Sequence, residues 1–209
     1  MRLITDFRDY YDHAFDTTGV GLLRRMTDGP TRFEALTWLK QLYGTPKFAY
    51  AWNLSFDAGD EVVVHFKEGH AGEGKLRARF RDALVAAPDA VVVQYHPESR
   101  GRSVRLLVIG EHVYWLEYRA FAWRSNDDPV ITTCAPVVDY DPELSRWYPL
   151  YAVDFIETRD GWKAIDLNVS PGLRHTPVRD ILSPTEVVDA IKRGVTPYSK
   201  TIVAEDADA

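Results

Sequence analysis

The chain has few of the residues on which several protein classes depend. Its 209 residues include one cysteine, and 31 acidic side chains outnumber 25 basic ones, for a formal net charge of −6. A single cysteine excludes an internal disulfide framework and a zinc knuckle. The acidic balance argues against general nucleic-acid binding, which needs a surplus of positive charge. We therefore expect no nucleic-acid partner.

Long apolar runs are also missing. No stretch approaches the roughly 20 apolar residues that a membrane span requires, and the sequence from Met1 to Asp6 lacks the pattern of a secretory signal. We expect a cytoplasmic protein with no membrane partner, and a homo-oligomer is compatible with this composition. Cys134 lies in a strand-like stretch, which favours a buried small side chain over a nucleophile.

The residues that are present are typical of an α+β protein with antiparallel sheets. Segments rich in β-branched and aromatic residues predict strands at 48–54, 61–66, 90–95, 103–109, 112–119, 130–136, 150–157 and 162–168. Two-residue turns are expected at Gly110-Glu111 and Asp160-Gly161. Apolar spacing and capping residues predict helices at 31–42, 75–86 and 184–193.

A glycine-rich segment follows the second predicted strand. Gly69, Gly72 and Gly74 are spaced so that backbone N–H groups could surround an anion, because no Cβ blocks the approach. A hairpin tip requires glycine as well, so the spacing alone leaves both interpretations open.

Three polar residues interrupt the last two predicted strands. Asp154 lies in one strand and Asp166 and Asn168 lie in the next, and the turn between them brings the three side chains together. Two carboxylates and an amide oxygen are hard ligands that suit Mg²⁺. A hydrogen-bonded polar ladder facing solvent is the alternative, and the cost of leaving such groups unpaired favours the metal.

Arginines recur beyond the glycine-rich segment. Arg105 and Arg119 lie on neighbouring predicted strands, and Arg124 follows shortly after. Arginine binds phosphate or carboxylate through two parallel hydrogen bonds, although a single one is more often a surface ion-pair partner.

In this order, these motifs resemble the ATP-grasp fold, and within it the ribosomal-protein glutamate ligases. The resemblance extends over residues 31–195. It is carried by four stretches: Val63–Gly74, Val92–His96 with Gly101–Arg105, Arg119 with Arg124–Asn126, and Val153–Asp154 with Asp166–Leu173. It implies two α+β lobes, at 31–100 and 101–200, that clamp a nucleotide. Residues 1–30 would replace the family's first domain, and 201–209 would form a disordered tail.

The resemblance also implies the chemistry. An acceptor carboxylate, on a small molecule or a peptide, would attack the γ-phosphate of ATP, and an amine would then displace phosphate to form an amide. The nucleotide would be bound by Arg32, His65, Lys67, Gly69, Gly72, Gly74, Gln94 and His96. Arg105, Arg119, Arg124 and Asn168 would assist catalysis, and Asp154, Asp166 and Asn168 would bind Mg²⁺.

The sequence departs from the family pattern at two of these positions. His65 stands where the family usually has a phosphate-binding lysine, so either the phosphates keep the imidazole charged or Lys67 or Lys75 takes over. Asp166 stands where glutamate is usual. These departures keep open an ATP-binding protein without ligase activity, or a structural protein that uses the same fold.

Overall fold

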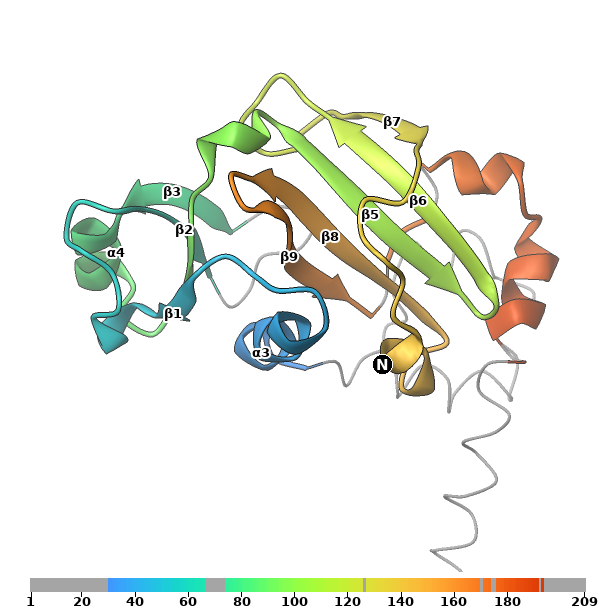
Figure 1. The fold of residues 1–209 in the computed structure, drawn as a ribbon, viewed down its shortest axis with the longest axis horizontal. Coiled ribbons are helices and arrows are strands. Elements are labelled where there is room, and N and C mark those ends of the chain that lie inside the picture. The colour runs from blue at the N-terminus through green and yellow to red at the C-terminus, as the bar shows by residue number, and fades with distance from the viewer. Residues whose placement is uncertain are drawn as a thin grey trace, which may run out of the picture.

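The computed structural model describes residues 30–66, 74–125, 127–169, 171–173, 176–191 and 193. They form two antiparallel sheets that lie side by side, with helices against their faces (Figure 1). Within these residues no helix is both long enough and apolar enough to cross a membrane.

The first sheet has four strands in the order β1-β4-β2-β3. Their bounds are β1 Phe48–Tyr50, β2 Glu61–His65, β3 Lys75–Arg79 and β4 Val91–Gln94. One face packs against helix α4, Phe80–Ala86, and buries Val62, Val64, Phe80 and Ala83. The alternating burial of β2 agrees with a strand that has one apolar face.

The prediction of a helix at 75–86 is wrong for its first part and confirmed for its second. Residues Lys75–Arg79 form β3, which pairs with β2 from His65↔Lys75 to Glu61↔Arg79, and only Phe80–Ala86 is helical. The hairpin gives the first residues inter-strand hydrogen bonds, and this tertiary pairing overrides their helical propensity. The predicted strand at 48–54 likewise ends at Tyr50, because Ala51–Asn53 form a 3₁₀ turn and Leu54 has φ of 52°.

The second sheet has five strands in the order β7-β6-β5-β8-β9. Their bounds are β5 Arg102–Ile109, β6 His112–Arg119, β7 Val130–Thr133, β8 Leu150–Thr158 and β9 Gly161–Asn168. The predicted strands and the turn at Gly110-Glu111 are confirmed, except that the strand predicted at 130–136 ends at Thr133. The second hairpin turn lies one residue earlier than predicted, since Thr158 pairs with Gly161.

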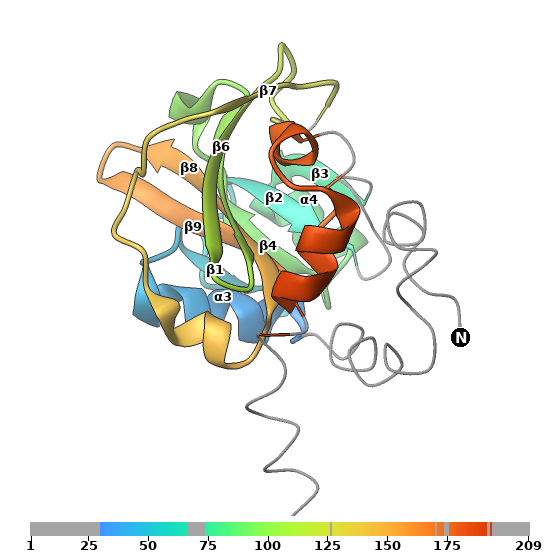
Figure 2. The same ribbon diagram turned by 90° about the vertical axis from the view of Figure 1, so that its right-hand side faces the viewer.

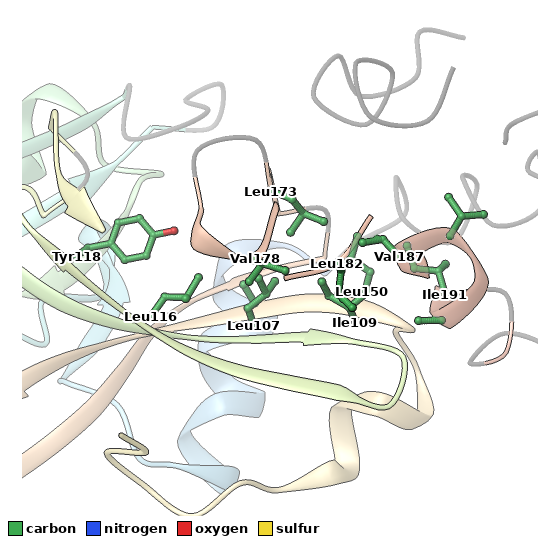
Figure 3. Packing of buried hydrophobic residues seen from close by; sticks show 13 residues of the cluster. Leu107, Ile109, Leu116, Tyr118, Leu150, Leu173, Val178, Leu182, Val187 and Ile191 are labelled. Carbon is green, nitrogen blue, oxygen red and sulfur yellow. The ribbon is translucent and has the colours of Figure 1, made fainter. Parts of the chain in front are cut away.

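Both faces of the second sheet are covered. On one face Leu107, Ile109 and Leu116 pack against the C-terminal residues, including the helix at 184–191 (Figures 2 and 3). Ser183 and Glu186 form the predicted capping box at the start of that helix. On the other face Leu106, Phe155 and their neighbours form a second core.

Helix α3, Arg32–Leu42, joins the two sheets and confirms the prediction for 31–42. A capping box of Thr31 and Glu34 begins the helix. Ala35 and Leu39 are buried in the core of the second sheet, whereas Leu36 packs against Val91 and Val93 of the first. The same helix therefore contacts both sheets (Figure 1).

Candidate functional site

One face of the second sheet is apolar for most of its length and becomes polar at one end. Alternation places Arg105 on the same face as Leu107 and Ile109. In the sheet register Arg105 lies opposite Asp154, and Asp154 lies opposite Asp166. Three neighbouring strands thus place three charged side chains in a row.

Arg105 and Asp154 form a two-pronged ion pair. Arg105 Nε donates to Asp154 Oδ1 at 2.6 Å, and Arg105 Nη2 donates to Oδ2 at 2.8 Å. The guanidinium also lies 5.0 Å from the centroid of the Tyr118 ring. Burial opposes the charge of Arg105, but the Asp154 carboxylate raises the pKa of Arg105 above its ordinary value. The Arg105 guanidinium is therefore charged at neutral pH.

A β-bulge in β9 places two consecutive residues on the cavity side. Asp154 pairs with Asp166 and Phe155 pairs with Ala164, so Ile165 has no residue opposite it. Ala164 and Leu167 both belong to the core on the far face. Ile165 and Asp166 between them therefore lie on the same side of the strand.

Asp166 connects β9 to α3 and β3. Arg32 Nη1 lies 2.9 Å from Asp166 Oδ1, and Lys75 Nζ lies 3.9 Å from Oδ2. Burial alone would raise the pKa of Asp166, but the positive charges of Arg32 and Lys75 outweigh it and lower the pKa to about 2. The carboxylate is ionised at neutral pH.

His65 lies beside this cluster, opposite Lys75 in the β2–β3 pairing. Burial, followed by the positive charges of Arg32 and Lys75, lowers the pKa of His65 well below its usual range. The imidazole of His65 is therefore neutral at pH 7.

A cavity of about 100 Å³ lies between the two sheets. Three kinds of side chain line it. The acidic and basic residues are Lys75, Arg102, Arg105, Arg124 and Asp154, together with the neutral His65; the residues around the end of β4 are Gln94, Tyr95, His96 and Ser99; and the apolar walls include Val63, Val93, Tyr118, Trp123, Ile156 and Ile165. The structure therefore gathers at one cavity five residues that the sequence selected as site residues, His65, Gln94, His96, Arg105 and Arg124, with Asp154 from the expected metal set.

The residues after β4 border the cavity from the first sheet. Tyr95 N donates to the Glu61 carbonyl at 3.0 Å, and Ser99 Oγ donates to the His96 carbonyl at 3.0 Å. Burial lowers the pKa of His96. Its buried Nε2 atom has no hydrogen-bond partner among the residues that the structure describes, so the cavity includes a neutral imidazole with one unused polar atom.

Gly101 allows the segment after β6 to approach the cavity. Its φ of 72° is in the left-handed region, and Ala120 N donates to the Gly101 carbonyl at 3.0 Å. A Cβ at this position would overlap the carbonyl oxygens of Ala120 and Ala122. The contact positions Trp123 and Ser125 on the cavity wall, where Ser125 Oγ accepts from Ser103 Oγ at 2.6 Å.

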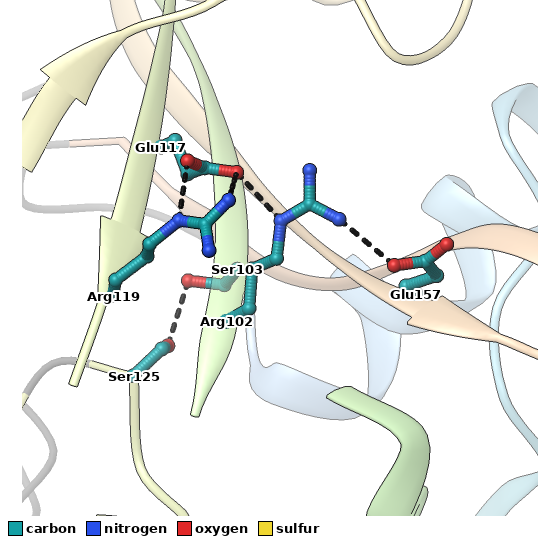
Figure 4. A network of polar contacts seen from close by, with 6 residues as sticks. All are labelled: Arg102, Ser103, Glu117, Arg119, Ser125 and Glu157. Carbon is teal, nitrogen blue, oxygen red and sulfur yellow. Dashed lines mark hydrogen bonds and ion pairs between the residues drawn. The ribbon is translucent and has the colours of Figure 1, made fainter. Parts of the chain in front are cut away.

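Arg119 lies in a separate ion-pair network next to the cavity (Figure 4). Its Nε donates to Glu117 Oε2 at 2.7 Å, and Arg102 Nε donates to Glu117 Oε1 at 2.5 Å. The Arg119 side chain is 64% exposed and does not line the cavity, whereas Arg102 does. In this structure the network makes Arg119 a partner of Glu117.

The other selected residues fall into two groups. Lys67, Gly69 and Gly72 lie outside the described residues, and Gly74 begins the next described segment with φ of 71°. Asn168 lies opposite Ala152 in β9, on the same side of the strand as Asp166. Arg32, Asp166 and Asn168 do not line the cavity themselves, and Lys75 connects Asp166 to it.

Several lining residues were not selected from the sequence. Ser103 lies within the strand predicted at 103–109 and could have been found by counting alternate positions from Arg105. Ile165 could not have been found in this way, because a regular strand would place its side chain on the core side of the sheet. Cys134 is half-buried against the second core, and burial raises the pKa of its thiol. It is a packing residue, as expected.

Among the residues that the structure describes, no three His, Cys, Asp or Glu side chains are close enough to hold a metal ion by themselves. Asp154 is bonded to Arg105 through both oxygens, and Asp166 is bonded to Arg32. The two carboxylates thus have protein cations as partners in the ligand-free chain.

Comparison with known proteins finds similarity in structure alone. No family model and no curated protein sequence matches the chain. Among solved structures, the macrocyclase MdnC from Microcystis aeruginosa, bound to its precursor peptide, superposes with a TM-score of 0.54 at 12% identity. That match covers 79% of this chain and 61% of the macrocyclase.

Two further structures agree with the first. D-alanine–D-alanine ligase from Bacillus anthracis has a TM-score of 0.51 at 13% identity, over 81% of this chain and 67% of the ligase. The ATP-grasp ligase PsnB, with precursor peptide and AMPPNP, has a TM-score of 0.50 at 15% identity, over 82% of this chain and 59% of PsnB. The chain thus spans about three fifths to two thirds of these proteins. Its two antiparallel sheets, with the cavity between them, form the α+β ATP-grasp fold.

Proposed function

We propose that the chain is an ATP-dependent ligase that joins a carboxylate to an amine. The observation that carries the proposal is the cavity between the two sheets, whose lining combines uncharged side chains after β4, among them Gln94 and His96, with the cations Lys75 and Arg105. A nucleotide has the same division, because its base is flat and its phosphates are anionic. The ATP-grasp fold supports the assignment.

The proposed orientation follows from this division. The adenine lies near Gln94 and His96, and the phosphates extend toward Lys75 and Arg105. Tyr118 and Ile156 are among the apolar lining residues and would limit the access of water. The two sheets would act as two lobes that clamp the nucleotide.

Mg²⁺ is the cofactor that the fold suggests. The donor set fits its chemistry, because Asp154, Asp166 and Asn168 offer carboxylate and amide oxygens on adjacent strands. These residues would hold the ion, and it would neutralise the phosphate charge. In the ligand-free chain Arg32, Lys75 and Arg105 balance the same carboxylates.

The proposed reaction has two steps. An oxygen of the acceptor carboxylate attacks the γ-phosphorus of ATP, the bond to the β-phosphate oxygen breaks, and ADP leaves. The nitrogen of an amine then attacks the acyl carbon, phosphate leaves, and the amine loses a proton as the amide forms. Lys75, Arg105 and Arg124 would align the anionic groups and stabilise their charge, which is most of what phosphoryl transfer requires.

The acceptor is proposed to be a small-molecule or peptide carboxylate. MdnC and PsnB were each solved with a precursor peptide, and D-alanine–D-alanine ligase is named for a small amino acid. This range is consistent with the fold being used for both kinds of acceptor.

ADP release in the presence of ATP and Mg²⁺ tests the proposal. We expect ADP to form only when both a carboxylate and an amine are supplied from a panel of amino acids and short peptides, and mass spectrometry should detect the amide. An amide product that forms without ATP, or ADP release that never depends on an acceptor, would count against ligation.

A nucleotide-binding protein without ligation is the second candidate. It is favoured by His65 at the usual lysine position and by Asp154, whose two oxygens both accept hydrogen bonds from Arg105. It predicts that calorimetry detects Mg-ATP binding while ADP formation stays at background with every acceptor pair.

A further inference from the structure

The cluster around Asp166 has an excess of positive charge. Among the residues that the structure describes, Arg32 and Lys75 contribute two positive charges against the one negative charge of Asp166, and the side chains are 27%, 20% and 20% exposed, respectively. A half-buried surplus charge is costly unless an anion lies nearby. The cluster therefore favours an anionic ligand.

The two cations hold Asp166 differently. Arg32 Nη1 is within hydrogen-bond distance of Oδ1, at 2.9 Å, whereas Lys75 Nζ is 3.9 Å from Oδ2, too far for a hydrogen bond. Lys75 lines the cavity and Arg32 does not. The weakly held cation is thus the one that faces the ligand space.

We propose that Lys75 is the residue whose positive charge binds the phosphates, and that Asp166 is the resting partner that a phosphate group replaces. The inference rests on the proposed function and assigns the role that His65 leaves open. Arg32 is a positioning residue, since it keeps Asp166 in place when Lys75 moves.

The geometry suits such an exchange. Lys75 lies directly opposite His65 in the register, so the two side chains leave the same face of the sheet from Cα atoms about 5 Å apart. A lysine ammonium is a compact charge on a flexible stem, and it can reach a second partner by rotating side-chain bonds. When it departs, Asp166 Oδ2 keeps only the long hydrogen bond of 3.4 Å from Arg32 Nη2 among its described partners.

Titration calorimetry with adenosine, ADP and ATP tests the proposal, each with Mg²⁺ and with EDTA. Lys75→Ala should weaken ATP and ADP binding roughly 10- to 100-fold, the range of a charged hydrogen bond, and leave adenosine binding unchanged. Lys75→Arg should recover most of the loss. Lys40→Ala, which removes the same charge from the exposed side of α3, is the matched control and should change nothing.

Asp166→Asn provides an independent measurement. Because this substitution frees Lys75, the variant should bind ATP in EDTA more tightly than the unaltered chain does. The increase in ATP affinity on adding Mg²⁺ should be smaller for the variant. Thermal melting of each variant separates a binding effect from unfolding.

Two results would overturn the inference. One is a Lys75→Ala variant that binds ATP as well as Lys40→Ala does, and the other is an equal loss for adenosine and ATP. If the unaltered chain binds ATP in neither condition, the proposed function fails as well, so the two failures are distinguishable.

Discussion

Arg105 and Asp154 face each other across β5 and β8, and Arg105 donates two parallel N–H···O bonds of 2.6 and 2.8 Å to the Asp154 carboxylate. With 17% and 18% of their side chains exposed, they are the least exposed of the directly hydrogen-bonded ion pairs at the cavity. Each neutralises the other in surroundings where an unpaired charge would be costly.

Removing one member of this pair should be more harmful than its two hydrogen bonds suggest. Asp154→Ala leaves the Arg105 charge without its partner, and we expect a loss of about 3 kcal/mol in the free energy of unfolding, measured with urea. Arg81→Ala breaks an exposed pair with Asp82 and should cost less than about 1 kcal/mol. Equal losses in the two variants would contradict this interpretation.

Gly101 should tolerate no side chain. Gly101→Ala adds a Cβ that overlaps two carbonyl oxygens at a φ of 72°, so we expect a loss of roughly 2 kcal/mol in urea unfolding, together with weaker adenosine binding as the Trp123 segment shifts. Gly59→Ala is the control, because nothing lies within 4 Å of its added Cβ. A Gly101→Ala variant as stable as Gly59→Ala would show that the segment adapts.

The Glu117 network should make stability depend on pH. Hydrogen bonds from Arg119 and then Arg102, opposed by burial, hold the pKa of Glu117 below its ordinary value of 4.5. The contribution of Glu117 to the free energy of unfolding is therefore complete above pH 4.5, and it is lost as the pH falls through the lowered pKa. Glu117→Gln should cost about 2 kcal/mol at pH 7 and much less near pH 3.

Glu157→Gln is the comparison for this measurement. Glu157 is 49% exposed and accepts only from Arg102 in the network, so its loss should be below about 1 kcal/mol at every pH. A Glu117→Gln effect that does not change between pH 7 and pH 3 would be incompatible with a charge-dependent contact.

Leu36 should be needed for the contact between α3 and the first sheet. It is 1% exposed and packs against Val91 and Val93, so Leu36→Ala should cost about 3 kcal/mol in urea unfolding. Leu76→Ala removes the same atoms from a side chain that is 52% exposed and should cost less than about 1 kcal/mol. Similar values would mean that the Leu36 site collapses around the smaller side chain.

Much of the fold could be predicted from the sequence, because its strands are short, β-branched and separated by recognisable turns. One hairpin turn predicted that the strands of Asp154 and Asp166 pair, but the facing of these two residues depends on the bulge, since a regular register would place Ile165 opposite Asp154. The strand at Lys75–Arg79 could not be predicted, since its stability comes from pairing with β2 and its own composition favours a helix.

Less of the candidate site than of the fold could be predicted from the sequence. The sequence does not indicate that Arg119 pairs with Glu117. The two residues lie two positions apart on one strand, and this spacing does not determine their side-chain rotamers. The partners of Asp166 lie 134 and 91 positions away in the chain, so their contacts depend on the packing of α3 and β3. Ile165 lines the cavity because of a β-bulge, and no distinctive residue type marks that bulge in the sequence.

Helix α3 also limits how the two halves of the molecule could move. It packs mainly on β9 and contacts the first sheet through a few side chains, among them Leu36. A rigid-body opening of the cleft would therefore carry α3 with the second sheet and separate it from Val91 and Val93. Only a small apolar area would be newly hydrated by such a hinge motion, at a cost of a few kcal/mol. The free energy of ligand binding between the sheets could offset a cost of that size.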